Sequence, residues 1–311
     1  MKGFRVVQFV LVALIFFSAT PVFALGQPNV NLGFTSFLDG APPAGPGHYI
    51  SEYLQFYTAD QINDAGPAGS DLDAGVDVTV LMNQYIYQSE EALLGGKLGI
   101  NVMLPIVSID SDAPLNDSGS GLGDLLVGPF IQWDPIMGSK GPLMLNRFEM
   151  QLIFPTGDYE SDKALNPGSN HFSFNPYWAA TVFAGPKTTI SWRLHYLWNG
   201  QNEEFRHPVF TAGDHDLEPG DAVHANFSVA YEVLPKQLRV GINGYWFDQI
   251  SDTKVDGNKV EAFAEKVLAI GPGAVWHLSQ NSHLFFNAFF ETEAESRPEG
   301  ERYNLRLVHH F

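Results

Sequence analysis

The feature that most constrains this chain is a regular alternation of apolar and polar residues over long segments. In one such segment Ile190, Trp192 and Leu194 share one face, whereas Ser191 and Arg193 share the other. Side chains of a β-strand point alternately to its two faces, so a period of two residues predicts strands rather than helices. The alternation therefore predicts an all-β protein.

The alternation recurs along almost the whole chain. It occurs in twelve segments, at residues 48–58, 74–87, 94–106, 122–133, 143–154, 171–183, 188–198, 222–232, 238–248, 264–277, 283–291 and 302–311. Strands of globular proteins are usually about 5–6 residues long. Most of these segments are longer, and they match the length of about 9–11 residues with which a tilted strand crosses a membrane.

The connections between the segments alternate in length. Residues 185–187 and 234–236 are tight turns, whereas residues 155–170 and 199–221 form long polar connections that carry much of the acidic charge. Short turns at one end and long loops at the other are typical of bacterial outer-membrane barrels. We therefore predict a single antiparallel transmembrane β-barrel of about 12 strands, in which an even strand count returns both termini to the periplasmic end.

Both ends of the chain agree with this location. Residues 1–24 read as a signal peptide, with Lys2 and Arg5 before an apolar stretch and with cleavage near Ala24. We expect residues 25–311 to form the barrel in the outer membrane of a Gram-negative bacterium, in contact with the lipid bilayer and lipopolysaccharide. The last strand ends on Phe311. A terminal aromatic residue resembles the signal that the outer-membrane barrel assembly machinery recognises.

Composition excludes several other classes of protein. The chain has no cysteine, which excludes disulfides, thiolate metal sites and a cysteine nucleophile. Its formal charge of −18 argues against a nucleic-acid partner, because proteins that bind nucleic acids carry basic surfaces. No local motif for a hydrolase, a metal or a cofactor is present, because the glycine-rich residues 119–124 precede a strand instead of a helix. Residues 214–221 could chelate a divalent cation, but a solvated acidic loop is the favoured interpretation.

The polar faces of the strands carry the candidate functional residues. A charge facing lipid costs about 2–4 kcal/mol at mid-membrane, so the polar faces must line the lumen. The candidate lumen-lining residues are Lys97, Asn101, Arg147, Glu149, Arg193, His195, Arg239, Asn243 and Arg306. They predict either a charged constriction that selects solutes or a salt-bridged plug that fills the barrel, and the sequence leaves both open.

Aromatic residues near the segment ends predict the girdles that mark the two membrane surfaces. The residues in question are Tyr49, Trp133, Tyr177, Trp178, Trp192, Trp198, Trp246 and Tyr303. Tyr49, Tyr53 and Tyr57 also share one face of the first strand. They could line a path for aromatic solutes, although a role as girdle and filler is the favoured interpretation.

Three short stretches carry a family resemblance. They are residues 121–129 (GLGDLLVGP), 154–159 (FPTGDY) and 168–176 (GSNHFSFNP). Together with the barrel layout, they resemble the MetA-pathway phenol-degradation family, whose members look like outer-membrane transporters. The resemblance covers most of the mature chain. It implies a barrel that admits aromatic or other hydrophobic compounds, and it supplies no catalytic residues.

The sequence thus favours a channel for small hydrophobic or aromatic solutes that cross by passive diffusion, and not an enzyme. Twelve strands lie between the filled eight-stranded barrel and the open porin, which predicts a narrow lumen. One alternative is a structural or adhesive barrel whose acidic extracellular loops bind partners. The other is a barrel enzyme, such as a lipase or protease, which would need a Ser/His/carboxylate cluster at one rim.

Overall fold

The computed structural model describes residues 26–28, 30–40, 45–65, 70–115, 117–139, 141–206, 212–260 and 264–311. The predicted signal peptide lies outside these residues. The strands of the described part are β1 (Gly47–Ile62), β2 (Leu72–Leu93), β3 (Gly96–Ser111), β4 (Ser118–Leu122), β5 (Leu125–Gly138), β6 (Gly141–Glu149), β7 (Leu152–Phe154), β8 (Ser173–Phe174), β9 (Tyr177–Phe183), β10 (Thr188–Asn199), β11 (Asn202–Phe205), β12 (His215–Glu218), β13 (Ala222–Leu234), β14 (Leu238–Gln249), β15 (Thr253–Val255), β16 (Asn258–Val260), β17 (Lys266–His277), β18 (Ser282–Glu295) and β19 (Pro298–His310).

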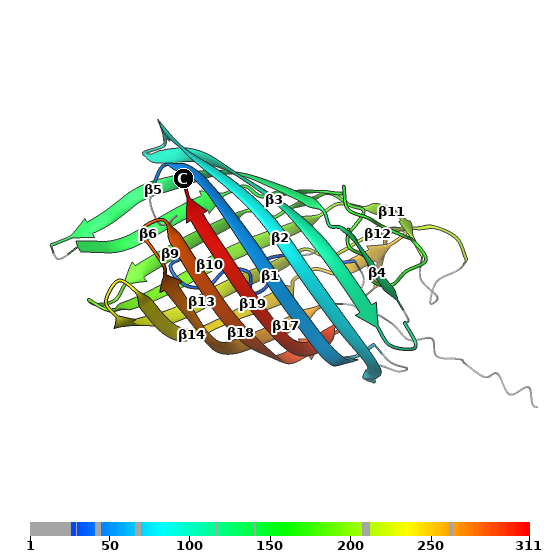
Figure 1. Ribbon diagram of the computed structural model, residues 1–311. Coiled ribbons are helices and arrows are strands. Elements are labelled where there is room, and N and C mark those ends of the chain that lie inside the picture. The colour runs from blue at the N-terminus through cyan, green and yellow to red at the C-terminus, as the bar shows by residue number, and fades with distance from the viewer. Residues whose placement is uncertain are drawn as a thin grey trace, which may run out of the picture.

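Fifteen of these strands close into one antiparallel barrel (Figure 1). The barrel closes where β1 pairs with β19, with Tyr49 opposite His310. Nine positions around the barrel hold one strand each, and three hold two strands in line, namely β4 with β5, β6 with β7, and β8 with β9. The described strands thus form a twelve-stranded barrel, as the alternation predicted.

The two ends of the barrel differ in their connections. Tight turns join the strands at one end, which we call the turn end and which also holds the start of β1 and the end of β19 (Figure 1). At the other end, the loop end, β11, β12, β15 and β16 form a separate four-stranded sheet. Strands at the turn end run further than the pattern predicted. For example, β2 continues to Leu93, and the turn is made by Leu94 and Gly95, both at positive φ.

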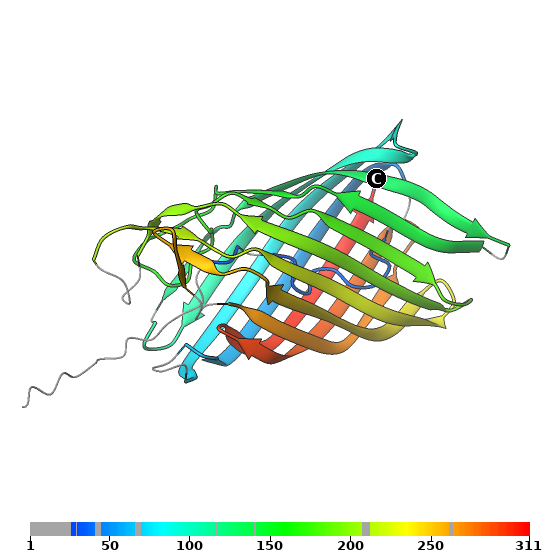
Figure 2. The same ribbon diagram turned by 180° about the vertical axis from the view of Figure 1, so that it is seen from behind.

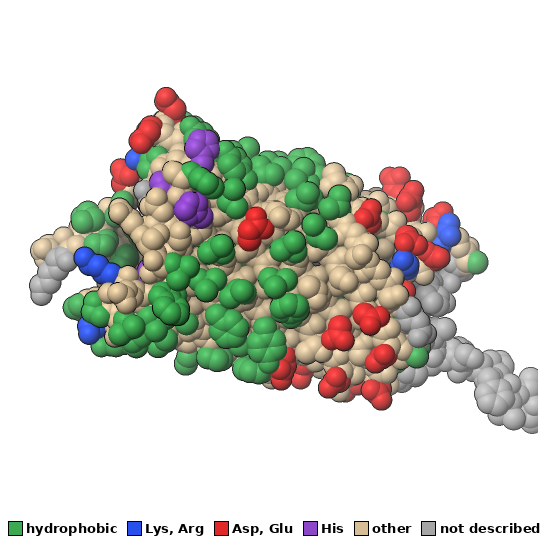
Figure 3. Space-filling model, in the orientation of Figure 1, with side chains coloured by type: hydrophobic (Ala, Val, Ile, Leu, Met, Phe, Trp, Pro, Cys, Tyr) green, Lys and Arg blue, Asp and Glu red, His purple; other side chains and the backbone are tan. Residues whose placement is uncertain are grey.

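The outer surface of the barrel is apolar along its middle. Figure 3 shows hydrophobic side chains over the centre of one face and acidic side chains gathered toward the loop end. Ile50, Phe56, Leu305 and Leu307 are among the exposed residues of β1 and β19. Because apolar side chains of this size face outward along the strands, the surface suits a lipid bilayer. Glu52 departs from this rule, since it occupies the outer face of β1 between Ile50 and Leu54.

No helix within the described residues is long and apolar enough to span a membrane.

Residues 26–28 and 30–40 run through the inside of the barrel, and we call them the luminal segment (Figures 1 and 2). The sequence pattern assigns these residues to the barrel but predicts no element for them. Their backbone groups bond to inward side chains instead of to a neighbouring strand. The N–H of Gly33 donates to Asn226 Oδ1 (2.8 Å), and Asn304 Nδ2 donates to the Gly33 carbonyl (3.2 Å).

The end of the luminal segment lies flat against the barrel wall at Gly40. A Cβ atom on Gly40 would lie 2.5 Å from the Leu145 carbonyl oxygen and 2.5 Å from the Thr181 nitrogen, so only glycine fits without a shift of the wall. The Gly40 N–H donates to Thr181 Oγ1 (2.9 Å), and its carbonyl accepts from Gln132 Nε2 (3.0 Å). At the other end of the segment, Gln27 Nε2 donates to the Gly220 carbonyl (2.9 Å), so the segment is docked at both of its ends and along its length.

Candidate functional site in the barrel lumen

All nine lumen-lining candidates sit on inward-facing positions of their strands, and all are buried or partly buried. The buried ones are Asn101, Arg147, Glu149, Arg193, His195 and Asn243. Arg239 and Arg306 are partly buried. Lys97 lies apart from this group near the turn end of β3, where its Nζ pairs with the exposed Glu90 at 3.4 Å.

A chain of hydrogen bonds joins β1, β2, β3, β6 and β9 at mid-barrel, with β5 lying between β3 and β6. Tyr53 donates to Gln84 Oε1 (2.7 Å), Gln84 Nε2 donates to Asn101 Oδ1 (2.9 Å), and Asn101 Nδ2 donates to Glu149 Oε1 (3.0 Å). The second oxygen of Glu149 accepts from the Tyr177 hydroxyl at 2.5 Å. Both oxygens of this fully buried carboxylate are thus satisfied, as a buried charge requires.

Arg193 joins the luminal segment to the wall. Its Nε and Nη2 donate to the two oxygens of Asp39, each at 2.7 Å, in a two-pronged ion pair. The guanidinium also lies 4.1 Å from the ring centroid of Tyr177. The pair is well shielded, because the side chains of Arg193 and Asp39 are 9% and 4% exposed. A bidentate Arg–carboxylate pair in such a site is strong and directional.

His195 and Asn243 have partners in the wall itself. His195 Nδ1 lies 3.1 Å from Asn175 Oδ1, and its ring stacks on that of His224 at a centroid distance of 4.0 Å. Asn243 Nδ2 donates to the carbonyl oxygen of Gly271 at 2.8 Å. Neither side chain lines the cavities described next.

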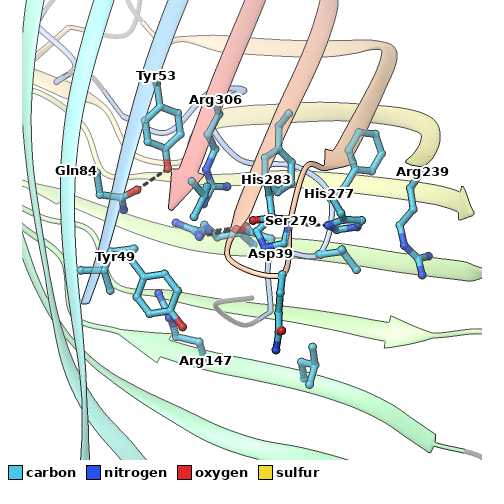
Figure 4. Close-up of a pocket in the computed structure, with 18 of the residues that line it drawn as sticks. Asp39, Tyr49, Tyr53, Gln84, Arg147, Arg239, His277, Ser279, His283 and Arg306 are labelled. Carbon is cyan, nitrogen blue, oxygen red and sulfur yellow. Dashed lines mark hydrogen bonds and ion pairs between the residues drawn. The ribbon is translucent and has the colours of Figure 1, made fainter. Parts of the chain in front are cut away.

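Three cavities follow one another along the lumen. A turn-side cavity of about 390 Å³ is lined by Phe37, Tyr49, Arg147, His283 and Arg306, among others (Figure 4). A loop-side cavity of about 210 Å³ is lined mainly by apolar side chains, including Phe34, Val80, Met82, Met103 and Leu126. A loop vestibule of about 230 Å³ lies beyond it, between Tyr159, Asn202 and Phe205.

Neighbouring cavities share lining residues. Tyr53, Gln84 and Arg193 line both the turn-side and the loop-side cavity. Val78 and Leu165 line both the loop-side cavity and the loop vestibule. The turn-side and loop-side cavities therefore adjoin at the level of Arg193, where Asp39 of the luminal segment meets the wall.

Sequence reasoning missed the luminal segment and the arginines of a second charged cluster around Glu291. Glu291 accepts hydrogen bonds from the hydroxyls of Tyr57 (2.8 Å) and Tyr245 (2.5 Å), and Arg302 lies 3.8 Å from it. A signal for Arg302 was available, because it shares the inward face of the last strand with Asn304 and Arg306. One signal for the segment was available as well, because Asp39 is the one acidic residue between positions 25 and 51.

The prediction of aromatic girdles is wrong for two residues. Tyr49 and Tyr177 face the lumen and are 0% and 1% exposed. Both lie on the inward face of their strands, together with Tyr53 and Tyr57 on β1. Trp178 and Trp198, by contrast, are exposed on the outer face. Aromatic content near a strand end therefore predicts a girdle only when the face of the residue is also considered.

The acidic loop residues are engaged in ion pairs and hydrogen bonds of the loop-end sheet. Arg206 pairs with Asp214, and His215 Nδ1 lies 2.7 Å from Asp256 Oδ2. Two hydrogen bonds lower the pKa of Asp256 below its ordinary value of 3.8. The larger effect comes from the backbone N–H of Asp216, and the smaller one comes from the His215 side chain. The described residues contain no group of three or more His, Asp or Glu side chains placed to hold a metal ion.

The sequence matches a known family over most of its length. The family described as "Putative MetA-pathway of phenol degradation" matches residues 59–307. The chain belongs to this family. The resemblance carried by the three glycine- and proline-rich stretches is therefore confirmed. Among curated proteins, none matches the chain.

One solved structure shows the same fold, and others match more weakly. The COG4313 outer membrane channel from Pseudomonas putida F1 is 20% identical with a TM-score of 0.75, covering 91% of this chain and 100% of that chain. The beta domain of the Bordetella autotransporter BrkA is 12% identical with a TM-score of 0.46, covering 86% and 100%. The CymD monoaromatic hydrocarbon channel is 9% identical with a TM-score of 0.41, covering 95% and 99%. This chain has the fold of an outer-membrane channel.

Proposed function

We propose that this protein is an outer-membrane channel through which small hydrophobic or aromatic solutes pass by diffusion, and that it is not an enzyme. The observation that carries the proposal is the series of three cavities along the lumen, joined through Val78 and Leu165 and through Tyr53, Gln84 and Arg193. A cavity of about 150 Å³ with apolar walls already holds a benzene ring. The apolar loop-side cavity is large enough for such a solute.

The lumen-lining charges would act as a selectivity zone within this channel. Arg147, Arg193 and Arg306 line the turn-side cavity, and Arg193 stands where it meets the loop-side cavity. Asn101 and Glu149 would support the selectivity zone through the hydrogen-bond chain that links them to Gln84. His195 and Asn243 lie in the wall, and Arg239 lies at the turn end, so their contribution would be to orient neighbours or to attract solutes. Lys97 is placed least favourably for selection.

We also propose the cellular setting of this channel. The apolar outer surface suits a lipid bilayer with lipopolysaccharide in its outer leaflet, in the outer membrane of a Gram-negative bacterium. Phe311 is 67% exposed, so the barrel assembly machinery could reach it. A signal peptide cleaved near Ala24 would place Gly26 close to the mature N-terminus. The acidic loop end would then face the exterior.

A growth experiment tests the channel. A strain that lacks the gene is grown on limiting amounts of a panel of aromatic and aliphatic carbon sources, with and without the wild-type gene. Val78→Trp would fill the junction between the loop-side cavity and the loop vestibule. Thr79→Trp adds the same side chain on the outward face of the same strand and serves as the matched control.

We expect growth on at least one aromatic source to require the gene. Thr79→Trp should restore that growth, and Val78→Trp should not. Full restoration by Val78→Trp, with both variants folded and inserted, would show that the cavities are not the path. Growth that never depends on the gene for any source would reject the channel function itself.

A further inference from the structure

The turn-side cavity carries more positive than negative charge. Its cationic lining residues are Arg147, Arg193, Lys236, Arg239 and Arg306, whereas its carboxylates are Asp39 and Glu232. Arg193 pairs with Asp39 at 2.7 Å, and Arg239 pairs with Glu232 at 2.9 Å. Both carboxylates are therefore used, and Arg147, Lys236 and Arg306 have no ion pair within the described part of the chain.

Arg147 is held in position, but its guanidinium forms no ion pair with the described residues. Its Nε donates to Gln132 Oε1 at 3.0 Å, and its guanidinium lies 3.9 Å from the ring centroid of Phe130. The side chain is 5% exposed, and Nη2 is buried without a hydrogen-bond partner in the described residues. Glu149 lies two residues away, but its oxygens are bonded to Asn101 and Tyr177. A buried donor without a partner is costly, which points to a ligand that completes it.

Arg306 is positioned in a similar way by aromatic rings. Its guanidinium lies 5.1 Å from the centroid of Tyr53 and 5.0 Å from that of Phe285, and its Nε has no partner among the described residues. Residues 41–44, which lie outside the described part, read Ala-Pro-Pro-Ala and contain no acid that could pair with it. His283, also on this wall, is 5% exposed with Nε2 unpaired in the described structure.

The remaining wall of the turn-side cavity is apolar and aromatic. Phe37, Tyr49, Ile86, Phe183 and Val308 line it, and Figure 4 shows Tyr49, Arg147, His283 and Arg306 around one common space. Small-molecule sites typically measure about 300–1,000 Å³ and combine apolar walls with a few convergent polar groups. The cavity, at about 390 Å³, has this composition.

We propose that the turn-side cavity binds small aromatic carboxylates, with the carboxylate on Arg147 and Arg306 and the ring on the aromatic wall. This inference rests on the proposed channel function and narrows its solutes to aromatic acids. A planar guanidinium offers two parallel donors that match a carboxylate. The flat apolar wall favours a ring over a phosphate ester, whose larger and more polar head would stay hydrated. Wild-type protein should therefore distinguish an acid from its neutral amide.

Binding is tested with sodium benzoate and benzamide, which differ only in the charged group. Isothermal titration calorimetry of the folded full-length barrel in detergent should show benzoate binding at least tenfold more tightly than benzamide. The double variant R147Q/R306Q should weaken benzoate binding about tenfold or more and leave benzamide binding unchanged, because charge-assisted hydrogen bonds are lost. R306Q alone, at the less buried arginine, should show a smaller loss in the same direction.

The control variant K187Q/K259Q removes two exposed lysines outside the three cavities. It matches the charge change of R147Q/R306Q and should bind benzoate as the wild type does. Equal binding of benzoate and benzamide by the wild type, or equal losses of benzoate binding in the two double variants, would overturn the proposal. If R147Q/R306Q does not fold, the wild-type comparison and R306Q decide the question.

The channel function and the aromatic-acid site can fail separately. Gene-dependent growth on neutral aromatic sources, together with no preference for benzoate over benzamide, would leave the channel standing and reject the aromatic-acid site. Benzoate binding that depends on Arg147 and Arg306, together with growth that never depends on the gene, would reject the channel and with it the role of the site in solute passage.

Discussion

Two groups of arginines line the same lumen but are held in different ways. On the loop side, Arg302 donates to Tyr245 Oη (3.2 Å) and Gln55 Oε1 (2.8 Å) and lies 3.8 Å from Glu291. Arg297, next to it, pairs with Glu265 at 3.4 Å. On the turn side, Arg147 and Arg306 have no ion pair among the described residues, although both contact aromatic rings.

The difference shows that inward position alone does not determine what a luminal charge does. An arginine that is paired with a carboxylate stiffens the wall, and its removal leaves that carboxylate uncompensated. An arginine without such a pair keeps its charge available for a solute. The loop-side cluster should therefore govern stability, and the turn-side pair should govern what binds. Four variants test this division, from the largest expected effect on stability to the smallest.

Glu291→Ala should produce the largest loss of stability. It removes the acceptor of Tyr57 and Tyr245 and leaves Arg302 without its nearest carboxylate. Breaking a buried charged network of this kind costs about 3–5 kcal/mol. Guanidinium titration of the barrel in detergent or lipid, followed by tryptophan fluorescence, measures the free energy of unfolding. Glu301→Ala, on the exposed face of β19, is the control, and a Glu291→Ala barrel no less stable than this control would reject the structural role of the cluster.

Asp39→Asn should have an intermediate effect, because it keeps the shape of the side chain but removes the charge that Arg193 binds. We expect a loss of about 1–3 kcal/mol, the range for hydrogen bonds to charged groups. The luminal segment should then detach more often, which raises single-channel conductance in a planar bilayer. Conductance equal to that of wild type, with or without the stability loss, would show that the segment does not limit passage.

Glu52→Leu extends the comparison to the outer wall, where an unpaired charge should bring no benefit. Glu52 lies on the lipid side of β1, opposite Asn83 and Leu307. Because a carboxylate on this face is unfavourable and leucine is not, we expect a gain of about 1–2 kcal/mol in the same unfolding experiment. Asn83→Leu, on the neighbouring outward position, serves as an uncharged comparison. A loss of stability in Glu52→Leu would mean that the carboxylate has a partner in the assembled membrane.

Arg147→Gln should change stability least, by about 1 kcal/mol or less. It removes the hydrogen bond to Gln132 and the cation–π interaction with the Phe130 ring, but it also removes a buried donor without a partner among the described residues. Its effect should be seen instead in ion selectivity. The reversal potential of the channel in a salt gradient should move toward cations, because one positive charge leaves the lumen. A stability loss as large as that of Glu291→Ala would erase the distinction between the two groups of arginines.

The strand pattern was available from the sequence because each strand reports its own orientation. Alternation assigned all twelve barrel positions and placed Arg147, Arg193 and Arg306 on the inward face. The prediction was wrong where closeness to a segment end was used in place of the alternation. Tyr49 and Tyr177 were placed in the girdles because they lie near segment ends, although their position in the alternation already directed them inward.

The luminal segment could not be predicted by the same means. Its backbone bonds to side chains of distant strands, as in the hydrogen bond from Gly33 to Asn226, 193 residues away. Such a segment needs neither alternation nor a neighbouring strand, and so it leaves no periodic signal. Gly40 illustrates this well, because its close approach to Leu145 and Thr181 exists only after the barrel has closed.

By itself the sequence determined that this chain forms a barrel and which side chains face its lumen, because the pleat of a strand turns a local pattern into an orientation. Only the tertiary structure decided which luminal charges are paired. Asp39 meets Arg193 across 154 residues, and Tyr57 meets Glu291 across 234. Partners in a lumen are set by strand register, barrel closure and the path of the luminal segment. These features depend on how different strands are placed relative to one another, and the residue pattern along a single strand does not specify that placement.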